Sequence, residues 1–206
     1  DGDTIIKVSA KRKKKMSTGS YDYVNSSSVM SEIPNLSHVA SSVKELKDAG
    51  QSKSTTRKKF NQLSNGVLRS LSASDISKIL INHVAKKNEG IQMMITDSAS
   101  NKNYWYDFQE SQMYKDVVRL LDDDYEYKPE LVFGRGKTSA KIIFKNEDGD
   151  KIDHNLRVRL VLNNGVGALL GLSKSNKTSM ATIKIQQDRC DKMMARLQKQ
   201  NIVTVF

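Results

Sequence analysis

The stretch SAKIIFKNEDGDKIDHNLRVRLVL (residues 139–162) predicts two antiparallel strands joined by a tight turn. Its first and last segments, SAKIIFK and LRVRLVL, are rich in β-branched and other apolar residues, which favour strands. Between them, NEDGDK contains Asp148-Gly149, and an Asp-Gly pair is typical of hairpin turns. These residues therefore predict a β-hairpin.

Further strands and helices are predicted on both sides of the hairpin. Runs of β-branched, aromatic and alternating apolar residues predict strands over 4–10, 91–96, 103–108, 130–134 and 202–206. Apolar residues that recur every three or four positions predict helices over 35–50, 72–84, 112–121 and 187–198. Because strands and helices do not alternate regularly, the sequence predicts an α+β (mixed α/β) fold, with a central mixed or antiparallel sheet flanked by helices.

The domain organisation follows from length and local composition. A chain of 206 residues is long enough for one sizeable core, so we expect a single nucleic-acid-binding domain over 1–206. Ser72 and Asp75 have the spacing of a capping box and predict a helix start at this point. Residues 11–28 and 51–59 are polar, basic segments that we expect to be flexible, the first as a loop or mobile connection and the second as an internal hinge.

The charge of the chain favours a polyanionic partner. Lys and Arg number 34 against 23 acidic residues, which gives a formal charge of +11. Such an excess favours nucleic acid, and we expect DNA. No apolar run approaches the roughly 18 residues of a membrane span, so we expect no membrane partner. Cys190 is the only cysteine, so no internal disulfide can form, and a cytoplasmic protein, or an intracellular or virion-associated one if the source is viral, is expected.

Several clusters of basic residues are candidates for phosphate contact. Arg157 and Arg159 lie two positions apart, so they share one face of the predicted strand, where guanidinium groups can fork onto phosphate oxygens. The alternative is an exposed face with cross-strand ion pairs. The candidate nucleic-acid-binding residues are Lys11, Arg12, Lys13, Lys14, Lys15, Arg135, Lys137, Arg157, Arg159, Lys174 and Lys177.

Two other motifs are weaker. FGRGKTS (residues 133–139) is not a nucleotide-binding phosphate loop, because that pattern needs glycine where Leu131 stands and must open a helix rather than a strand. KIQQD (residues 184–188) places two glutamines at the predicted entrance to the last helix, where glutamine can bind adenine edges.

The first fifteen residues, DGDTIIKVSAKRKKK, combine an acid, a strand and a lysine. Asp3, the segment TIIKV and Ser9-Ala10-Lys11 resemble the core of the PD-(D/E)XK, or restriction-endonuclease-like, nuclease superfamily. The resemblance implies Mg²⁺ as cofactor, Asp3 as a metal ligand and Lys11 as the catalytic lysine. Ser9 departs from the pattern, because it stands where the family usually has a second carboxylate. Glu32 is the candidate to replace that carboxylate as metal ligand, with Asp22 second.

Two functions therefore remain open. One is a DNA-binding protein that acts as a Mg²⁺-dependent endonuclease, with Asp3, Lys11 and Glu32 as its catalytic residues. The alternative is a non-catalytic basic nucleic-acid-binding protein or virion structural protein, such as one associated with a packaged phage genome. A third class, a protein–protein module with an incidental basic surface, is also compatible with the composition. A homodimer is a further expectation.

Overall fold

Two sheets form the framework of the protein, and the strands of each come from distant parts of the chain. The computed structural model describes residues 6–18, 20–26, 28–50, 52–135, 138–162, 181–187 and 189–206. The four-stranded sheet has the order β1-β3-β4-β9, with β1 parallel to β3 and the other pairs antiparallel. Its strands are β1 (Lys7–Lys13), β3 (Ile91–Asp97), β4 (Lys102–Asp107) and β9 (Val203–Val205).

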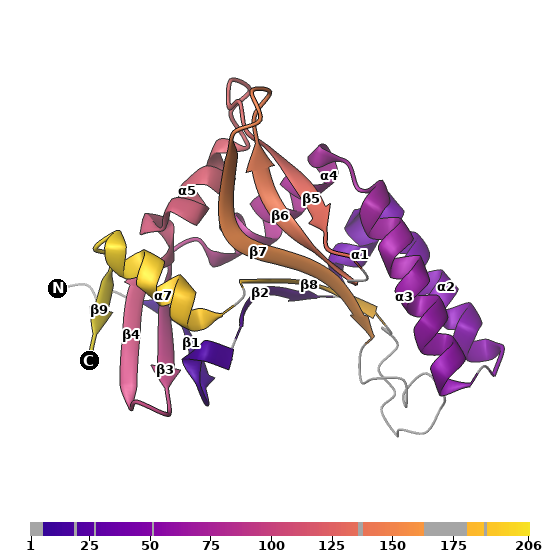
Figure 1. The fold of residues 1–206 in the computed structure, drawn as a ribbon, viewed down its shortest axis with the longest axis horizontal. Helices are drawn as coiled ribbons and strands as arrows, with labels where there is room; N and C mark the ends of the chain where they lie inside the picture. Colours follow the sequence, from indigo (N-terminus) through magenta and orange to yellow (C-terminus); the bar gives the residue numbers. More distant parts are fainter. Residues whose placement is uncertain are drawn as a thin grey trace.

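The second sheet is antiparallel throughout and has the order β2-β8-β7-β6-β5. It contains the predicted hairpin, with Gly149 in the turn at a φ of 92° that favours glycine. Its strands are β2 (Tyr21–Ser26), β5 (Lys128–Phe133), β6 (Ser139–Lys145), β7 (Lys151–Leu162) and β8 (Ala181–Gln187). Figure 1 shows β7 and β8 crossing the middle of the molecule, between β3 and β4 on the left and α2 and α3 on the right.

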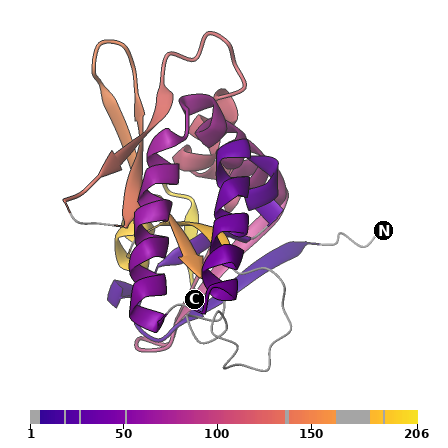
Figure 2. The ribbon, with the colours of Figure 1, turned by 90° about the vertical axis from the view of Figure 1, so that its right-hand side faces the viewer.

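The helices of the described residues cover these sheets. Figure 2 shows α2 and α3 side by side on one flank of the molecule. The α-helices are α1 (Ser28–Glu32), α2 (Pro34–Asp48), α3 (Lys53–Ser70), α4 (Ala73–Ile79), α5 (Gln112–Arg119) and α7 (Cys190–Lys199). Shorter 3₁₀ turns are η1 (Met16–Thr18), η3 (Lys86–Asn88) and η4 (Phe108–Glu110), and η2 (Leu80–Ala85) is a π-helix. Within the described part of the chain, no helix has the length and apolar character needed to cross a membrane.

Part of the hydrophobic core lies between α4 and one face of the five-stranded sheet. Ile76 and Ile79 of α4 pack toward Ile142, Val158 and Ile185, which come from three neighbouring strands, and all five side chains are buried. We call this side of the sheet its inner face. The mixed α+β fold predicted from the sequence is confirmed, as are the helix starting after Ser72 and its capping box with Asp75.

Three predictions of local structure are wrong. Residues 11–28 are not one loop, because β1 extends to Lys13 and β2 occupies Tyr21–Ser26. Residues 51–59 are largely helical, since α3 begins at Lys53. Its first seven residues, KSTTRKK, are all polar or basic, so they carry no apolar signal, and among the described side chains Phe60 is the first buried one. The two glutamines of KIQQD lie in strand β8 rather than at a helix entrance, because β8 is held between β2 and β7.

Candidate nucleic-acid interface

The side of the five-stranded sheet opposite the inner face carries two rows of polar side chains. Residues directly opposite each other in paired strands point to the same face of a sheet. One row crosses four strands, and its pairings join Asp22 to Gln186, Gln186 to Arg157, and Arg157 to Lys141. We call this side the outer face.

The second row lies two residues farther along the same strands. Its pairings join Asn25 to Lys184, Lys184 to Arg159, and Arg159 to Ser139. A bulge in β2 between Asp22 and Val24 keeps Asn25 on the same side as the rest of the row. The prediction that Arg157 and Arg159 share one strand face is consistent with this register.

Acidic side chains pair with the two lysines of the outer face. Lys184 Nζ lies 3.2 Å from Asp22 Oδ2, and Lys141 forms an ion pair with Asp153. Burial alone would raise the pKa of Asp153, but the hydrogen bonds from Lys141 and from the Asn155 backbone outweigh it and lower that pKa. Two acids, Asp22 and Asp153, stand against four cations, Lys141, Lys184, Arg157 and Arg159. These six residues together carry a net charge of +2.

Arg159 has a buried donor that is not used within the described residues. Its side chain is half-buried, and its Nε atom is buried with no hydrogen-bond partner among the described residues. A buried donor without a partner is costly, and an anion that accepts from it would remove that cost. The outer face therefore combines excess positive charge with an unsatisfied guanidinium donor.

Strand β1 brings further lysines to the β2 edge of this sheet. Lys11 Nζ lies 5.8 Å from the centre of the Tyr21 ring, and the Ser9 and Tyr21 hydroxyls lie 3.2 Å apart. Lys13 donates a hydrogen bond to the Ser20 carbonyl. Two of the candidate phosphate-binding residues in 11–15, Lys11 and Lys13, therefore lie beside the start of β2, the strand that also carries Asp22.

The other predicted phosphate contacts are dispersed or undescribed. Arg12 Nε donates to Ser98 Oγ at 2.9 Å, and Lys14 and Lys15 are exposed. Arg135 is exposed just after β5, the strand at the far edge of the sheet. Lys137, Lys174 and Lys177 lie outside the described residues.

The residues implied by the nuclease resemblance are not brought together by any contact in the described part of the chain. Asp3 lies outside the described residues. Glu32 is exposed on α1, and its Oε2 atom lies 2.5 Å from His83 Nε2. Among residues that the structure describes, no group of three or more His, Cys, Asp or Glu side chains has an arrangement that could hold a metal ion.

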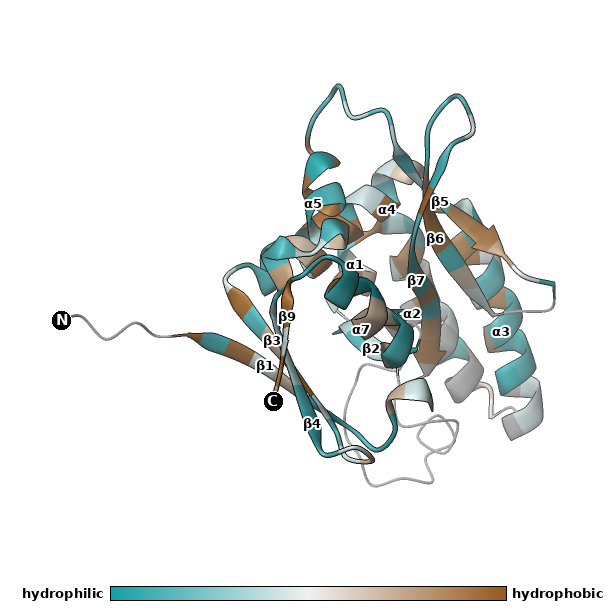
Figure 3. Cartoon of the chain, turned by 60° about the vertical axis from the view of Figure 1, so that its left-hand side comes forward, coloured by the Kyte–Doolittle hydropathy of each residue, from teal (hydrophilic) through white to brown (hydrophobic). Residues whose placement is uncertain are grey.

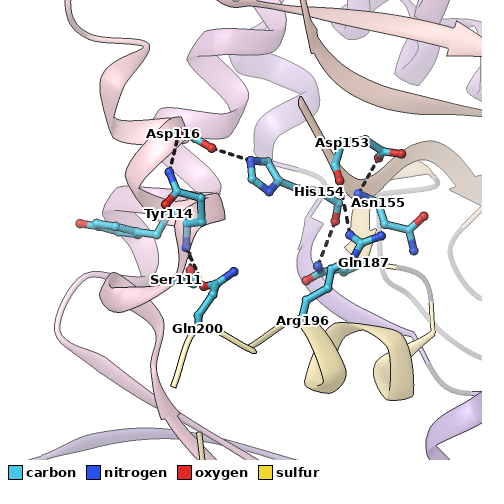
Figure 4. A network of polar contacts seen from close by, with 10 residues as sticks. Ser111, Tyr114, Asp116, Asp153, His154, Asn155, Gln187, Arg196 and Gln200 are labelled. Atoms are coloured by element: carbon cyan, nitrogen blue, oxygen red, sulfur yellow. Dashed lines mark hydrogen bonds and ion pairs between the residues drawn. The ribbon is translucent and has the colours of Figure 1, made fainter. Parts of the chain in front are cut away.

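A buried polar network links α5, β7 and β8 (Figure 4) and extends to Tyr23 of β2; sequence reasoning missed it. His154 Nε2 lies 2.9 Å from Asp116 Oδ2, and Asp116 is fully buried. Gln187 Nε2 donates to the His154 carbonyl at 2.9 Å, and its Oε1 accepts from the Tyr23 hydroxyl at 2.7 Å. Gln187 therefore has a structural role rather than a base-reading one. The available signal was the position of Asp116, three residues after Met113 and beside Val117 on the buried helix face.

No family model, curated protein or solved structure matches this chain. What the protein does is therefore inferred from its own residues and their geometry.

Proposed function

We propose that this protein binds DNA through the outer face of its five-stranded sheet. The observation that carries the proposal is the pair of adjacent rows in which Arg157 and Arg159 supply the excess positive charge. A guanidinium group is always charged and presents donors in a planar fork that matches two phosphate oxygens. Contacts of this kind position a protein on the DNA backbone without selecting a sequence.

The partial burial of the outer face supports a binding role over an incidental charged surface. Long side chains on an ordinary surface lose rotamer entropy when they bind, whereas half-buried arginines are already restricted. Lys13, which donates to the Ser20 carbonyl just before β2, adds a further cation near that edge of the sheet. These arginines and lysines would give part of the chain's net charge of +11 a role in binding a polyanion.

The proposal is tested by measuring fluorescence anisotropy of a labelled DNA duplex titrated with purified protein. Arg159→Ala is expected to weaken binding roughly tenfold, because hydrogen bonds to charged groups contribute about 1.5–3 kcal/mol. Lys151→Ala, which removes an exposed cation from the other end of β7, is the matched control and should change affinity little. Unchanged binding by a folded Arg157→Ala/Arg159→Ala double variant would refute the proposal.

Magnesium-dependent cleavage of DNA is a second candidate function, and one observation favours it. Asp22 Oδ1 is buried without a hydrogen-bond partner among the described residues, and Lys11 lies beside Tyr21, the neighbouring residue of β2, whose side chain points to the opposite face of the strand. Carboxylate oxygens are the ligands that Mg²⁺ prefers, and the ion would activate water for attack on phosphorus. Asp22 pairs with Lys184 through Oδ2 and keeps Oδ1 without a partner among the described residues, so we take it, rather than Glu32 beside His83, as the candidate acid.

Incubation of supercoiled plasmid with the protein and Mg²⁺ tests this second candidate. If the protein cleaves DNA, Lys11→Ala and Asp22→Asn should abolish cleavage while leaving most of the binding, and Glu32→Gln should retain cleavage. A protein that binds plasmid yet leaves it intact with Mg²⁺ or Mn²⁺ is not this endonuclease. That result would leave the DNA-binding proposal standing.

A further inference from the structure

The two faces of the four-stranded sheet differ in burial. Met93 and Ile95 of β3 and Tyr106 of β4 point to one face and are buried. The residues that alternate with them stay partly exposed, and Val8 on the same side of β1 is 42% exposed although it is apolar. Figure 3 shows the four strands at the left of the molecule, with hydrophobic positions along β1 and β9. We call this exposed side the open face.

Two neighbouring rows of side chains cross the open face, as the strand registers show. The middle row consists of Ala10, Met94, Trp105 and Thr204. The next row consists of Arg12, Thr96, Asn103 and Phe206. Asn103 and Phe206 belong to this row because they exchange backbone hydrogen bonds of 3.1 and 2.9 Å, which extends the pairing of β4 with β9 by one residue.

Trp105 and Phe206 form a pair of aromatic side chains on the open face. Thr204 lies opposite Trp105, and Phe206 follows two residues later, so the two rings belong to diagonal neighbours, about 7–8 Å apart in a sheet. Phe206 is 72% exposed and Trp105 is partly exposed. Exposed apolar side chains that are grouped in this way mark an interaction site.

Hydrogen bonds fix the orientation of the indole ring in advance. Trp105 Nε1 donates to Gln92 Oε1 at 3.0 Å, and Gln92 Nε2 donates to Asp107 Oδ2 at 2.8 Å. Asp107 also accepts from the Gln109 backbone N–H at 2.8 Å, so this carboxylate is used within the protein. The ring therefore loses little rotamer freedom when a ligand stacks on it.

Polar groups beside the aromatic pair suit the other parts of a nucleotide. Arg12 is exposed on the same row as Phe206, and its Nε donates to Ser98 Oγ at 2.9 Å, which orients the guanidinium. Asn103 Oδ1 accepts from the Thr96 hydroxyl at 2.7 Å, so the Asn103 amide nitrogen is the group offered to a ligand. A guanidinium group binds phosphate, and an amide can bind the edge of a base.

We propose that the open face binds single-stranded nucleic acid, with neighbouring bases stacked on Trp105 and Phe206 and a phosphate beside Arg12. Only unpaired bases offer their faces to aromatic side chains, so a single strand fits this site and a duplex does not. A second protein sheet packed on the open face would have to bury Arg12 and Asn103 as well, which is costly. The site lies on a different sheet from the outer face and does not rest on duplex binding there.

The fluorescence of Trp105 tests the proposal directly, because this residue is the only tryptophan of the chain. Titration of the full chain with an oligothymidylate of about ten nucleotides should quench the emission, since a base stacks on the indole. A duplex of the same length should bind without quenching. Quenching by the oligothymidylate, by the matching oligouridylate or by both supports the proposal, and their comparison identifies the preferred sugar.

Variants on the two sheets separate this site from the outer face. Phe206→Ala should weaken the affinity obtained from quenching roughly tenfold, because one stacked base is lost. Leu121→Ala is the matched control, since it removes another exposed apolar side chain just after α5, and it should change nothing. Arg157→Ala/Arg159→Ala should leave the quenching in place.

Four outcomes would overturn the proposal. The first is that neither oligonucleotide quenches Trp105, and the second is that Phe206→Ala binds as tightly as the wild type. Loss of quenching in Arg157→Ala/Arg159→Ala would place the single strand on the outer face. A concentration-dependent dimer in sedimentation velocity, accompanied by a shift in Trp105 emission, would assign the open face to a second copy. Duplex binding measured by anisotropy would still stand in each of the first two cases.

Discussion

Asp116 is a carboxylate placed inside the protein with its partners arranged around it. His154 Nε2 lies 2.9 Å from one of its oxygens, and Gln112 Nε2 donates to the other at 3.0 Å. Burial by itself raises the pKa of Asp116, but the hydrogen bonds from His154 and Gln112 outweigh burial and bring the pKa below its ordinary value. The residue therefore stabilises the fold as a carboxylate that joins α5 to β7.

Removing this carboxylate is expected to destabilise the protein. Asp116→Ala leaves the largely buried His154 ring without its partner and also removes the hydrogen bond from the exposed Gln112, so we expect a loss of about 1–3 kcal/mol in the free energy of unfolding. Urea denaturation followed by circular dichroism measures it. Asp124→Ala, at an exposed acid, should change stability by less than about 0.5 kcal/mol. A similar effect of both variants would contradict the structural role of Asp116.

The contribution of Asp116 is also expected to depend on pH. Because its pKa is lower in the folded chain than in the unfolded one, its stabilisation is fully present above the unfolded pKa of about 3.9. The stabilisation is lost as the pH falls through the lower folded-state pKa. The difference in unfolding free energy between the wild type and Asp116→Ala should thus be larger above about pH 4 than below it. A constant difference at all pH values would argue against this linkage.

At the scale of elements, α4 shows how local sequence can define a boundary. The Ser72 hydroxyl accepts a hydrogen bond from the Asp75 backbone N–H at 3.1 Å, and the Asp75 carboxylate accepts from the Ser72 backbone N–H at 3.0 Å. These bonds satisfy donors that a helix start otherwise leaves unpaired. The helix that follows carries Ile76 and Ile79 into the core. The cap therefore positions part of the hydrophobic core.

Loss of this cap should be measurable. Ser72→Ala is expected to reduce the free energy of unfolding by about 1 kcal/mol, which is typical for removal of an N-cap side chain. Thermal or urea unfolding provides the measurement. Ser74→Ala is the matched control, because Ser74 is exposed inside the same helix and alanine is a better helix former there. If Ser72→Ala is as stable as Ser74→Ala, the capping box does not contribute.

At the scale of the whole molecule, the charge is unevenly distributed. An open groove of about 680 Å³ lies between the loops around Tyr125 and the β6–β7 turn, at the top of Figure 1. Six acids and two lysines contribute to its lining: Asp123, Asp124, Glu126, Glu130, Glu147 and Asp148, with Lys128 and Lys145. A polyanion approaching the protein is repelled there and attracted to the basic strands, so the charge distribution would orient DNA on the outer face.

This distribution leads to a prediction about salt. The affinity for duplex DNA should fall linearly with salt on logarithmic axes, with a slope of about −0.9 for each phosphate neutralised. Arg157→Ala/Arg159→Ala should make that slope shallower by about 1.8, if each guanidinium neutralises one phosphate. Asp124→Asn in the acidic groove should leave the slope unchanged. Anisotropy titrations over a range of KCl concentrations measure both effects, and an unchanged slope in the double variant would place the phosphate contacts elsewhere.

The sequence by itself determined the features that depend on neighbouring residues. The turn at Asp148-Gly149, the cap at Ser72 and the shared face of Arg157 and Arg159 follow from turn chemistry, capping and the two-residue period of a strand. The net charge of +11 likewise needs no coordinates. These properties are local or summed, so one chain of letters is sufficient to predict them.

Only the tertiary structure decided which distant residues meet. Lys184 lies beside Arg159 because β8 pairs with β7, and Asp116 meets His154 because α5 packs near the same strand. Strand β8 was not predicted, and its last two residues, Gln186 and Gln187, were expected at the entrance to the final helix. Such pairings depend on how all elements bury their apolar faces together, and a slip of one residue would turn Lys184 toward the inner face. The outer face and the open face of the four-stranded sheet therefore exist only in the folded chain.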